Sequence, residues 1–250
     1  MGLGCGTRRG WCRTRSLAAE DAATGPAGEH EPLVTVFSHG EGLQDEGPQH
    51  GRVRPMAEIR QRFHEELRAL EGDVQRTGAQ AQLLLDKALQ ALPGGDLELC
   101  EEVVRGDDVV DALYLEVERR ILHLFALQTP VASDLRLLTA LLHINLHLER
   151  VGDQAVNLAK ITMAADGLPQ NPTVLHDLEE MGAVALGMVE AAMGALARRD
   201  LALARQLPEM DDPIDAQNRG MLAKVLAVSE DKGMLEWGVR MYVVCGVASA

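Results

Sequence analysis

Apolar residues recur at helical spacing from Met56 almost to the end of the chain, and this periodicity restricts the possible folds more than any other feature. They stand three and four positions apart, which places them on one face of an α-helix. Aromatic residues make up only 3% of the sequence, and Leu, Ala, Val and Met dominate its apolar content. Because this composition favours helices packed on helices over sheets, we predict an all-α fold.

Proline, glycine and capping residues set the limits of the first two predicted helices. The first covers residues 57–92 and ends at the Pro93–Gly95 turn. The second follows Asp96, which we interpret as its N-cap, and extends to residue 127.

A third helix is predicted over Pro130–Lys160, with Thr129 as its cap and the proline at its first position. The segment Asp166–Pro172 contains one glycine and two prolines, so it breaks the helical pattern. Further along, Asp212 and Pro213 form a candidate helix restart, because a proline in a helix interior costs up to about 3 kcal/mol.

Residues 1–55 differ from the rest of the chain. Gly, Pro, Arg, His and Glu are mixed there without a period, and the single strand-like piece, residues 34–37, has no partner strand. We predict a disordered or spurious N-terminal extension, with Met56 as the natural start; a regulatory tail is the alternative. No apolar stretch follows Arg8 and Arg9, which argues against a signal peptide.

The helical pattern repeats. Residues 87–111 line up without gaps on residues 191–215, each 104 positions further along. A shared register over such a span predicts two tandem three-helix units, the second aligned on the first. The repeat places three acidic residues on three others: Asp96 on Asp200, Asp107 on Asp211 and Asp111 on Asp215.

We predict a first unit at residues 56–166, a linker at 167–172 and a second unit at 173–250. The repeat counterparts of Glu149 and Asp153 fall at positions 253 and 257, beyond Ala250. The second bundle is therefore predicted to be incomplete in its third helix, as a truncated or frameshifted reading frame would leave it.

Two pairs of acidic residues form the strongest candidate site. Asp107 and Asp111 lie on the second predicted helix, and Glu149 and Asp153 lie on the third. The members of each pair are four positions apart, so they stack on one helix face and repel by roughly a few tenths of a kcal/mol. If the two helices run side by side, four carboxylates converge, and such hard oxygen ligands suit a divalent or ferric cation.

The charge and the cysteines limit the possible partners and the compartment. With a net charge of −14, the chain lacks the basic surface that nucleic-acid binding requires. No run of 18 apolar residues predicts a membrane span, so any membrane association is expected to be peripheral. The four cysteines have no CxxC spacing, which is typical of reduced cytosolic thiols, and Cys100 is expected to fill a packing position.

Other conspicuous residues have simpler interpretations. His143 and His147 also stack four positions apart, but they lie about 200° around the helix from Glu149, so we interpret them as surface or inter-helix histidines. Arg136 and Arg240 occupy equivalent positions of the repeat and are expected to form ion pairs rather than to bind phosphate. The methionines Met181, Met188, Met193, Met221, Met234 and Met241 are expected to fill the core.

Four stretches resemble the PhoU family of phosphate-transport regulators, over roughly residues 56–242. They are RFHEEL at Arg62–Leu67, GDDVVD at Gly106–Asp111, FALQTPVASDLRLL at Phe125–Leu138 and HLERVGDQAVNLAK at His147–Lys160. The resemblance implies a pair of three-helix bundles, no catalysis, and E(D)xxxD motifs that bind multinuclear iron or zinc clusters on the bundle surface. It also implies a cytoplasmic homodimer that acts at the inner face of the membrane. There the phosphate ABC transporter ATPase and a phosphate-sensing histidine kinase are its partners, and it negatively regulates phosphate uptake and the starvation response.

On this resemblance, Asp107, Asp111, Glu149 and Asp153 are the metal ligands, and Asn157 could add a carbonyl oxygen. Asp211 and Asp215 match half of the motif in the second unit, where we predict no competent cluster because their partners are missing.

Two other function classes remain open. A carboxylate-bridged di-metal oxidase also uses a helix bundle, but its Glu-x-x-His spacing does not accompany these acids. A metal-free helical scaffold is the third class.

Overall fold

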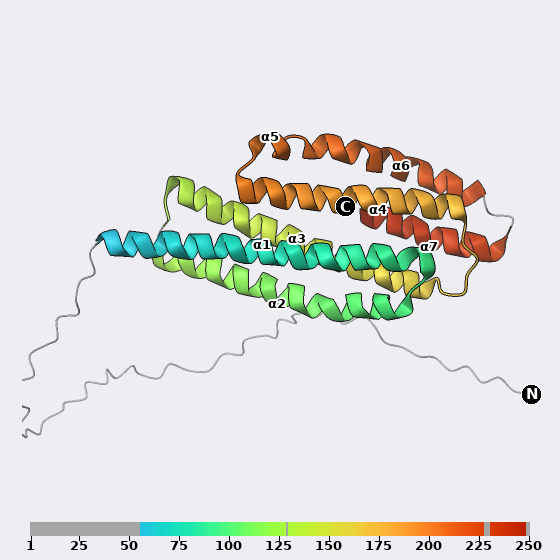
Figure 1. The fold of residues 1–250 in the computed structure, drawn as a ribbon, viewed down its shortest axis with the longest axis horizontal. Coiled ribbons are helices and arrows are strands. Elements are labelled where there is room, and N and C mark those ends of the chain that lie inside the picture. The colour runs from blue at the N-terminus through green and yellow to red at the C-terminus, as the bar shows by residue number, and fades with distance from the viewer. Residues whose placement is uncertain (1–55, 129, 228–230, 249–250) are drawn as a thin grey trace, which may run out of the picture. The chain divides into compact units, whose positions relative to one another are not determined.

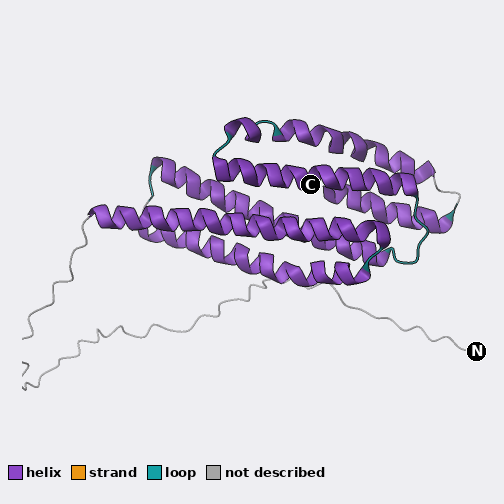
Figure 2. Ribbon diagram, viewed as in Figure 1, coloured by secondary structure: helices purple, strands orange, loops and turns teal. Residues whose placement is uncertain are grey.

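The computed structural model describes residues 56–128, 130–227 and 231–248 (Figure 1). Within these ranges every element is a helix, as Figure 2 shows, and the predicted all-α fold is confirmed. The predictions made for residues 1–55 lie outside the described residues.

The first two helices follow the sequence prediction closely. Helix α1 is Met56–Gly94 and helix α2 is Leu97–Gln128. The turn between them passes through Gly95 at φ 60°, a left-handed conformation that glycine adopts without a Cβ clash. Asp96 is the N-cap that we expected, because its Oδ1 accepts a hydrogen bond of 3.0 Å from the backbone N–H of Leu99.

Helix α3, Ala132–Ala164, begins two residues later than predicted. Its N-cap is Val131, which is extended at φ −123° and ψ 153°, so Pro130 precedes the helix and does not occupy its first position. The first turn closes on the Val131 carbonyl, which accepts a hydrogen bond of 3.2 Å from the N–H of Asp134. Thr129, the predicted cap, lies outside the described residues.

Helices α1, α2 and α3 pack on one another. Their apolar stripes meet in a cluster of fully buried residues that includes Leu70 of α1, Ile121 of α2 and Leu141 of α3. Each such side chain contributes about 1.5–3 kcal/mol through burial. Met193 of the next helix belongs to the same cluster, so the first three helices share a core with the second half of the chain.

The second half contains α4 (Pro172–Arg198), α5 (Leu201–Ala204), α6 (Leu207–Ala227) and α7 (Lys232–Ala248). Asn171 caps α4, since its side chain accepts hydrogen bonds from the backbone N–H groups of Thr173 and Val174.

The chain does not restart at Asp212 and Pro213 as the sequence suggested. The break lies earlier, because the Gln206 carbonyl accepts hydrogen bonds from Glu209 and Met210 and so starts α6. Pro213 stands inside α6, where it can donate no hydrogen bond to the preceding turn. The counterpart of α2 is thus divided into α5 and α6.

Helix α7 has 17 residues, whereas α3, its counterpart in the repeat, has 33. It packs against α3, α4 and α6, and α1 also contacts α4, so the described helices form one compact unit. The boundaries at 166 and 173 stay a prediction.

Helix α4 has the length and composition of a membrane-spanning helix. An 18-residue window of it has a mean hydropathy of 1.4, and 22% of that window is buried. Core helices of globular proteins meet the same criteria, so the absence of a membrane span stays a prediction as well.

Candidate metal site

The candidate site lies where α2 and α3 approach each other. Gly152 of α3 is buried there, and a Cβ added to it would lie 3.2 Å from Cγ1 of Val110 and 3.6 Å from Oδ1 of Asp107. Seven positions before Gly152 in α3, the buried Asn145 donates a 2.9 Å hydrogen bond to the backbone carbonyl of Tyr114 in α2. A glycine and a buried amide therefore hold α3 close to α2.

The four predicted ligands differ in exposure. Asp107 and Glu149 are half-buried, whereas Asp111 and Asp153 are exposed. Oδ1 of Asp107 is buried and has no hydrogen-bond partner. Oδ1 of Asn145 in the same interface is likewise buried without a partner, but a carboxylate oxygen that has lost its hydration costs more than an amide oxygen because it carries charge.

The acids interact across the interface. Burial raises the pKa of Asp107, and the neighbouring Asp111 and Asp153 raise it further, while Lys160 acts in the opposite direction. Burial also raises the pKa of Glu149, followed by the effects of Asp153, Asp111 and Asp107. Each half-buried acid thus experiences the negative charge of acids on both helices. The structure brings the two predicted pairs onto facing surfaces.

The donor set fits a hard cation in charge and chemistry, but the side chains do not form a ready ligand cage. Among the described residues, no group of three or more His, Cys, Asp or Glu side chains is arranged to hold a metal ion. Asp111 and Asp153 are exposed, so their side chains have room to adopt other rotamers. The metal site stays a prediction.

Sequence reasoning missed three residues of this interface, Gly152, Asn145 and Lys160. A signal for the first was available, because a glycine inside a long helix costs about 1 kcal/mol relative to alanine and implies a packing role. For Lys160 no local pattern existed, since its effect on Asp107 depends on how α3 lies against α2.

The other conspicuous residues of the first half lie outside the interface or at its edge. His143 and His147 are exposed, as we expected of surface histidines. Asn157 is exposed too, and its Nδ2 donates a 3.4 Å hydrogen bond to Oε1 of Gln154. Cys100 is a fully buried free thiol, which confirms its packing role.

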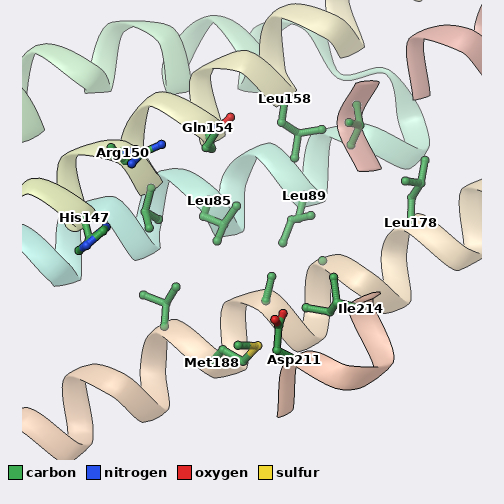
Figure 3. Close-up of a pocket in the computed structure, with 15 residues that line it drawn as sticks. Leu85, Leu89, His147, Arg150, Gln154, Leu158, Leu178, Met188, Asp211 and Ile214 are labelled. Atoms are coloured by element: carbon green, nitrogen blue, oxygen red, sulfur yellow. The ribbon is translucent and has the colours of Figure 1, made fainter. Parts of the chain in front are cut away.

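The second-half residues are placed as follows. Arg240 forms a 2.9 Å ion pair with Glu236 of its own helix, whereas Arg136 is exposed and its ion pair stays a prediction. Asp215 is 3.4 Å from the Arg219 guanidinium, and Asp211 lines a cavity of about 340 Å³ together with Leu85, Met188 and Ile214 (Figure 3). The buried methionines are Met181, Met193, Met221 and Met241.

Fold and interface together define an all-α protein of two related helix groups, with an acidic interface in the first. The PhoU domain model matches residues 74–162 and 178–245, and the chain belongs to the PhoU family. Over 155 residues it is 34% identical to the phosphate-specific transport system accessory protein PhoU homolog of Aquifex aeolicus, covering 62% of this chain and 69% of that protein. It is 28% identical over 185 residues to the homolog of Clostridium acetobutylicum, covering 73% and 84% respectively.

Solved structures agree with the family in fold. The crystal structure of PhoU from Pseudomonas aeruginosa matches with a TM-score of 0.71 and 23% identity, over 75% of this chain and 90% of that one. The phosphate transport system regulatory protein PhoU from Streptococcus pneumoniae matches with a TM-score of 0.69 and 24% identity. The predicted family resemblance and fold class are confirmed.

Proposed function

We propose that this protein is a regulatory adaptor of phosphate uptake and not an enzyme. The observation that carries the proposal is the PhoU domain match in both halves of the chain. The relatives found over most of the described chain are named as accessory proteins of a phosphate-specific transport system. An accessory protein acts by binding one state of its partner better than another, which shifts the balance between the states.

The partners in this proposal are the ATPase of a phosphate ABC transporter and a phosphate-sensing histidine kinase, met in the cytoplasm at the membrane surface. The adaptor acts as a homodimer and restrains both uptake and the starvation response. Its expression in a bacterium without its own PhoU protein tests this. We expect lower phosphate uptake and renewed repression of a starvation reporter when phosphate is plentiful. An unchanged reporter, with folded protein present, would contradict the regulatory role.

The second part of the proposal is that Asp107, Asp111, Glu149 and Asp153 hold iron or zinc. A bound cation would neutralise the clustered charges and link α2 to α3. Three observations support it: the unpartnered Oδ1 of Asp107, the raised pKa of Asp107 and Glu149, and the close approach of the two helices at Gly152. Gly152 and Asn145 position the two helix faces, and the metal would determine how firmly those faces are held.

Elemental analysis of the purified protein tests the metal site. We expect iron or zinc in the natural sequence and a loss of most of it in Asp107→Asn and in Glu149→Gln. Glu101→Gln is the matched control, because Glu101 is exposed on α2 and pairs only with the exposed Arg105 in a 3.4 Å contact. Equal metal content in all four proteins would contradict the assignment, and metal-free protein would favour the helical scaffold. Oxygen consumption with added ferrous iron would reveal the oxidase.

A further inference from the structure

Four exposed leucines lie in line on the outer surface of α2 and α3. They are Leu115 and Leu122 of α2 and Leu135 and Leu146 of α3, and their exposed fractions are 58%, 53%, 43% and 41%. The first two are seven positions apart and the other two are eleven apart. At 100° per residue, each pair stays within about 20° on its helix. We call these four side chains the leucine strip.

The leucine strip faces away from the core. Val117 and Leu124 of α2 are buried, and each stands two positions after a strip leucine, which places it about 200° around the helix. The principal neighbours of α2 are α1 and α3. The core side of α2 is therefore already covered, while the strip lies on a side that no described helix covers.

The strip is continuous with the candidate metal site. Asp111 stands four positions before Leu115 on α2, and Asp153 follows Leu135 by 18 residues, which is five full turns of α3. Both aspartates raise the pKa of Glu149, so the two helix faces meet at this end. The surface thus has leucines toward the α2–α3 loop and carboxylates at its other end.

The fold does not require leucine along this surface. On α6, the repeat counterpart of Leu115 is Arg219, which is also exposed and stands in the register that aligns Asp111 with Asp215. The same helix position therefore accommodates a charged side chain. Exposed apolar residues that the fold does not need, aligned on one surface, are typical of a binding site.

A second copy of the chain fits this surface poorly. In a symmetric dimer each contact occurs twice, so a parallel alignment would place Asp111 and Asp153 against the same acids of the other copy. An antiparallel alignment would place them against leucines. Both arrangements leave carboxylates without partners, and the net charge of −14 on each chain adds repulsion. Basic residues beside an apolar face would match the surface instead.

We propose that the leucine strip binds an amphipathic α-helix of a partner protein, whose apolar face covers the leucines and whose basic end lies against Asp111 and Asp153. A helix of about 18 residues would span the surface, because Leu135 and Asp153 are about 27 Å apart along α3 at 1.5 Å per residue. The inference rests on the proposed adaptor role, since an adaptor needs a surface for its partner. It does not depend on the metal site.

A designed peptide of 18 residues is the first probe, with leucines on one helical face and three lysines in its last turn. A second peptide has glutamates in place of the lysines, and a third has the first sequence scrambled. All titrations contain a chelator, so that no cation occupies the acids. We expect fluorescence anisotropy to show at least roughly tenfold tighter binding of the lysine peptide than of the glutamate peptide. The scrambled peptide should not bind.

Three variants of the full chain locate the binding. Leu122→Gln combined with Leu135→Gln should weaken the lysine peptide at least about tenfold. Leu83→Gln is the matched control and should not, because Leu83 is 45% exposed on α1, outside the strip. Asp111→Lys combined with Asp153→Lys should reverse the order of the lysine and glutamate peptides. All of these side chains are exposed, so the changes leave the core intact.

Four binding results would overturn the proposal. These are absence of binding by the lysine peptide, equal binding by the two glutamine proteins, an unchanged peptide order in the lysine protein, and a dimer in sedimentation that the double glutamine change abolishes. The last would show that a second copy covers the strip.

The bacterium without its own PhoU protein separates this inference from the proposed function. The natural chain and Leu83→Gln should restore repression of the starvation reporter, and the Leu122→Gln, Leu135→Gln protein should lose it. Failure of the natural chain would contradict the regulatory role and leave the peptide results standing. Restoration by all three proteins would overturn the strip as the partner surface and leave the regulatory role intact.

Discussion

The α2–α3 interface and the cavity beside α6 carry related residues in the same register, yet they present different environments. In the first, Val110 lies under Gly152 of α3, and the adjacent Asp107 has a buried oxygen. In the second, the half-buried Asp211 lines a cavity beside the buried Ile214. The comparison teaches that a covering helix, and not the acidic residue alone, produces a desolvated carboxylate.

The difference has an electrostatic consequence. A covering helix removes water from Asp107 and brings Asp153 near it, and both effects raise its pKa. Asp215, on the exposed side of α6, instead pairs with Arg219 at 3.4 Å. A surface pair of this kind contributes about 0–1 kcal/mol and leaves Asp215 hydrated, so our proposed cation site lies in the first half only.

Metal removal should have the largest effect on stability, and we expect that effect to come from the α2–α3 interface alone. At a free metal concentration one hundred times the dissociation constant, binding to the folded state stabilises it by about 2.7 kcal/mol. We expect chelation to lower the melting temperature of the natural protein and to leave that of Asp107→Asn unchanged. Calorimetry with and without a chelator measures this. Asp211→Asn, the repeat-matched control, should respond to chelation as the natural protein does; a lost response would place a site in the second half.

Gly152→Leu tests the close approach of α2 and α3. Its side chain would collide with Val110, and overpacking of this kind costs about 1–3 kcal/mol. Urea unfolding measures the loss. Gly72→Leu is the control, because Gly72 lies on the exposed face of α1 with no atom within 4 Å of an added Cβ. We expect it to be neutral or to stabilise the helix by about 0.5–1 kcal/mol. Equal losses in both proteins would contradict the interface geometry.

Removal of one carboxylate should stabilise the metal-free protein. Burial and neighbouring acids raise the folded-state pKa of Asp107 and Glu149, so their ionised forms oppose folding. This penalty is absent below their ordinary pKa values of 3.8 and 4.5, and it grows as the pH rises through the higher folded-state values. At pH 7, Asp107→Asn should gain roughly a few tenths of a kcal/mol for each repulsive pair removed.

Urea unfolding in the presence of a chelator at pH 4 and pH 7 measures this gain. The advantage of Asp107→Asn should shrink at the lower pH, while Glu101→Gln should show none at either. A loss of stability in Asp107→Asn at pH 7 would show that this carboxylate has a stabilising partner.

Asp215→Asn should have the smallest effect. It removes one exposed ion pair, with Arg219, and should change the free energy of unfolding by less than about 0.5 kcal/mol. The same urea titration measures it. A change above 1 kcal/mol would mean that the second acidic pair is as constrained as the first, and the contrast between the two regions would be lost.

Local patterns were sufficient for most of the helices. Asp96 behaves as the N-cap that its position before an apolar stripe indicated, and Gly95 ends the preceding turn. The predicted helix starts were less accurate near prolines, because a proline is compatible with more than one position relative to a helix start. Pro130 lies before α3 instead of at its first position, and Pro213 lies inside α6 instead of at a break. In both cases hydrogen bonds of the adjacent turn, and not the proline, select the helix start.

The sequence by itself determined the helical periodicity and the stacking of two acidic pairs, because these depend on contacts within a turn or two of one helix. The repeat of 104 positions follows from comparing the two segments directly. Only the tertiary structure decided which acids lose water, since burial of Asp107 requires Gly152 to bring a second helix against it. It also decided that Asp211, the repeat counterpart of Asp107, lies half-buried at a cavity. Desolvation and cavity shape arise between elements that are distant in sequence, and no local pattern records them.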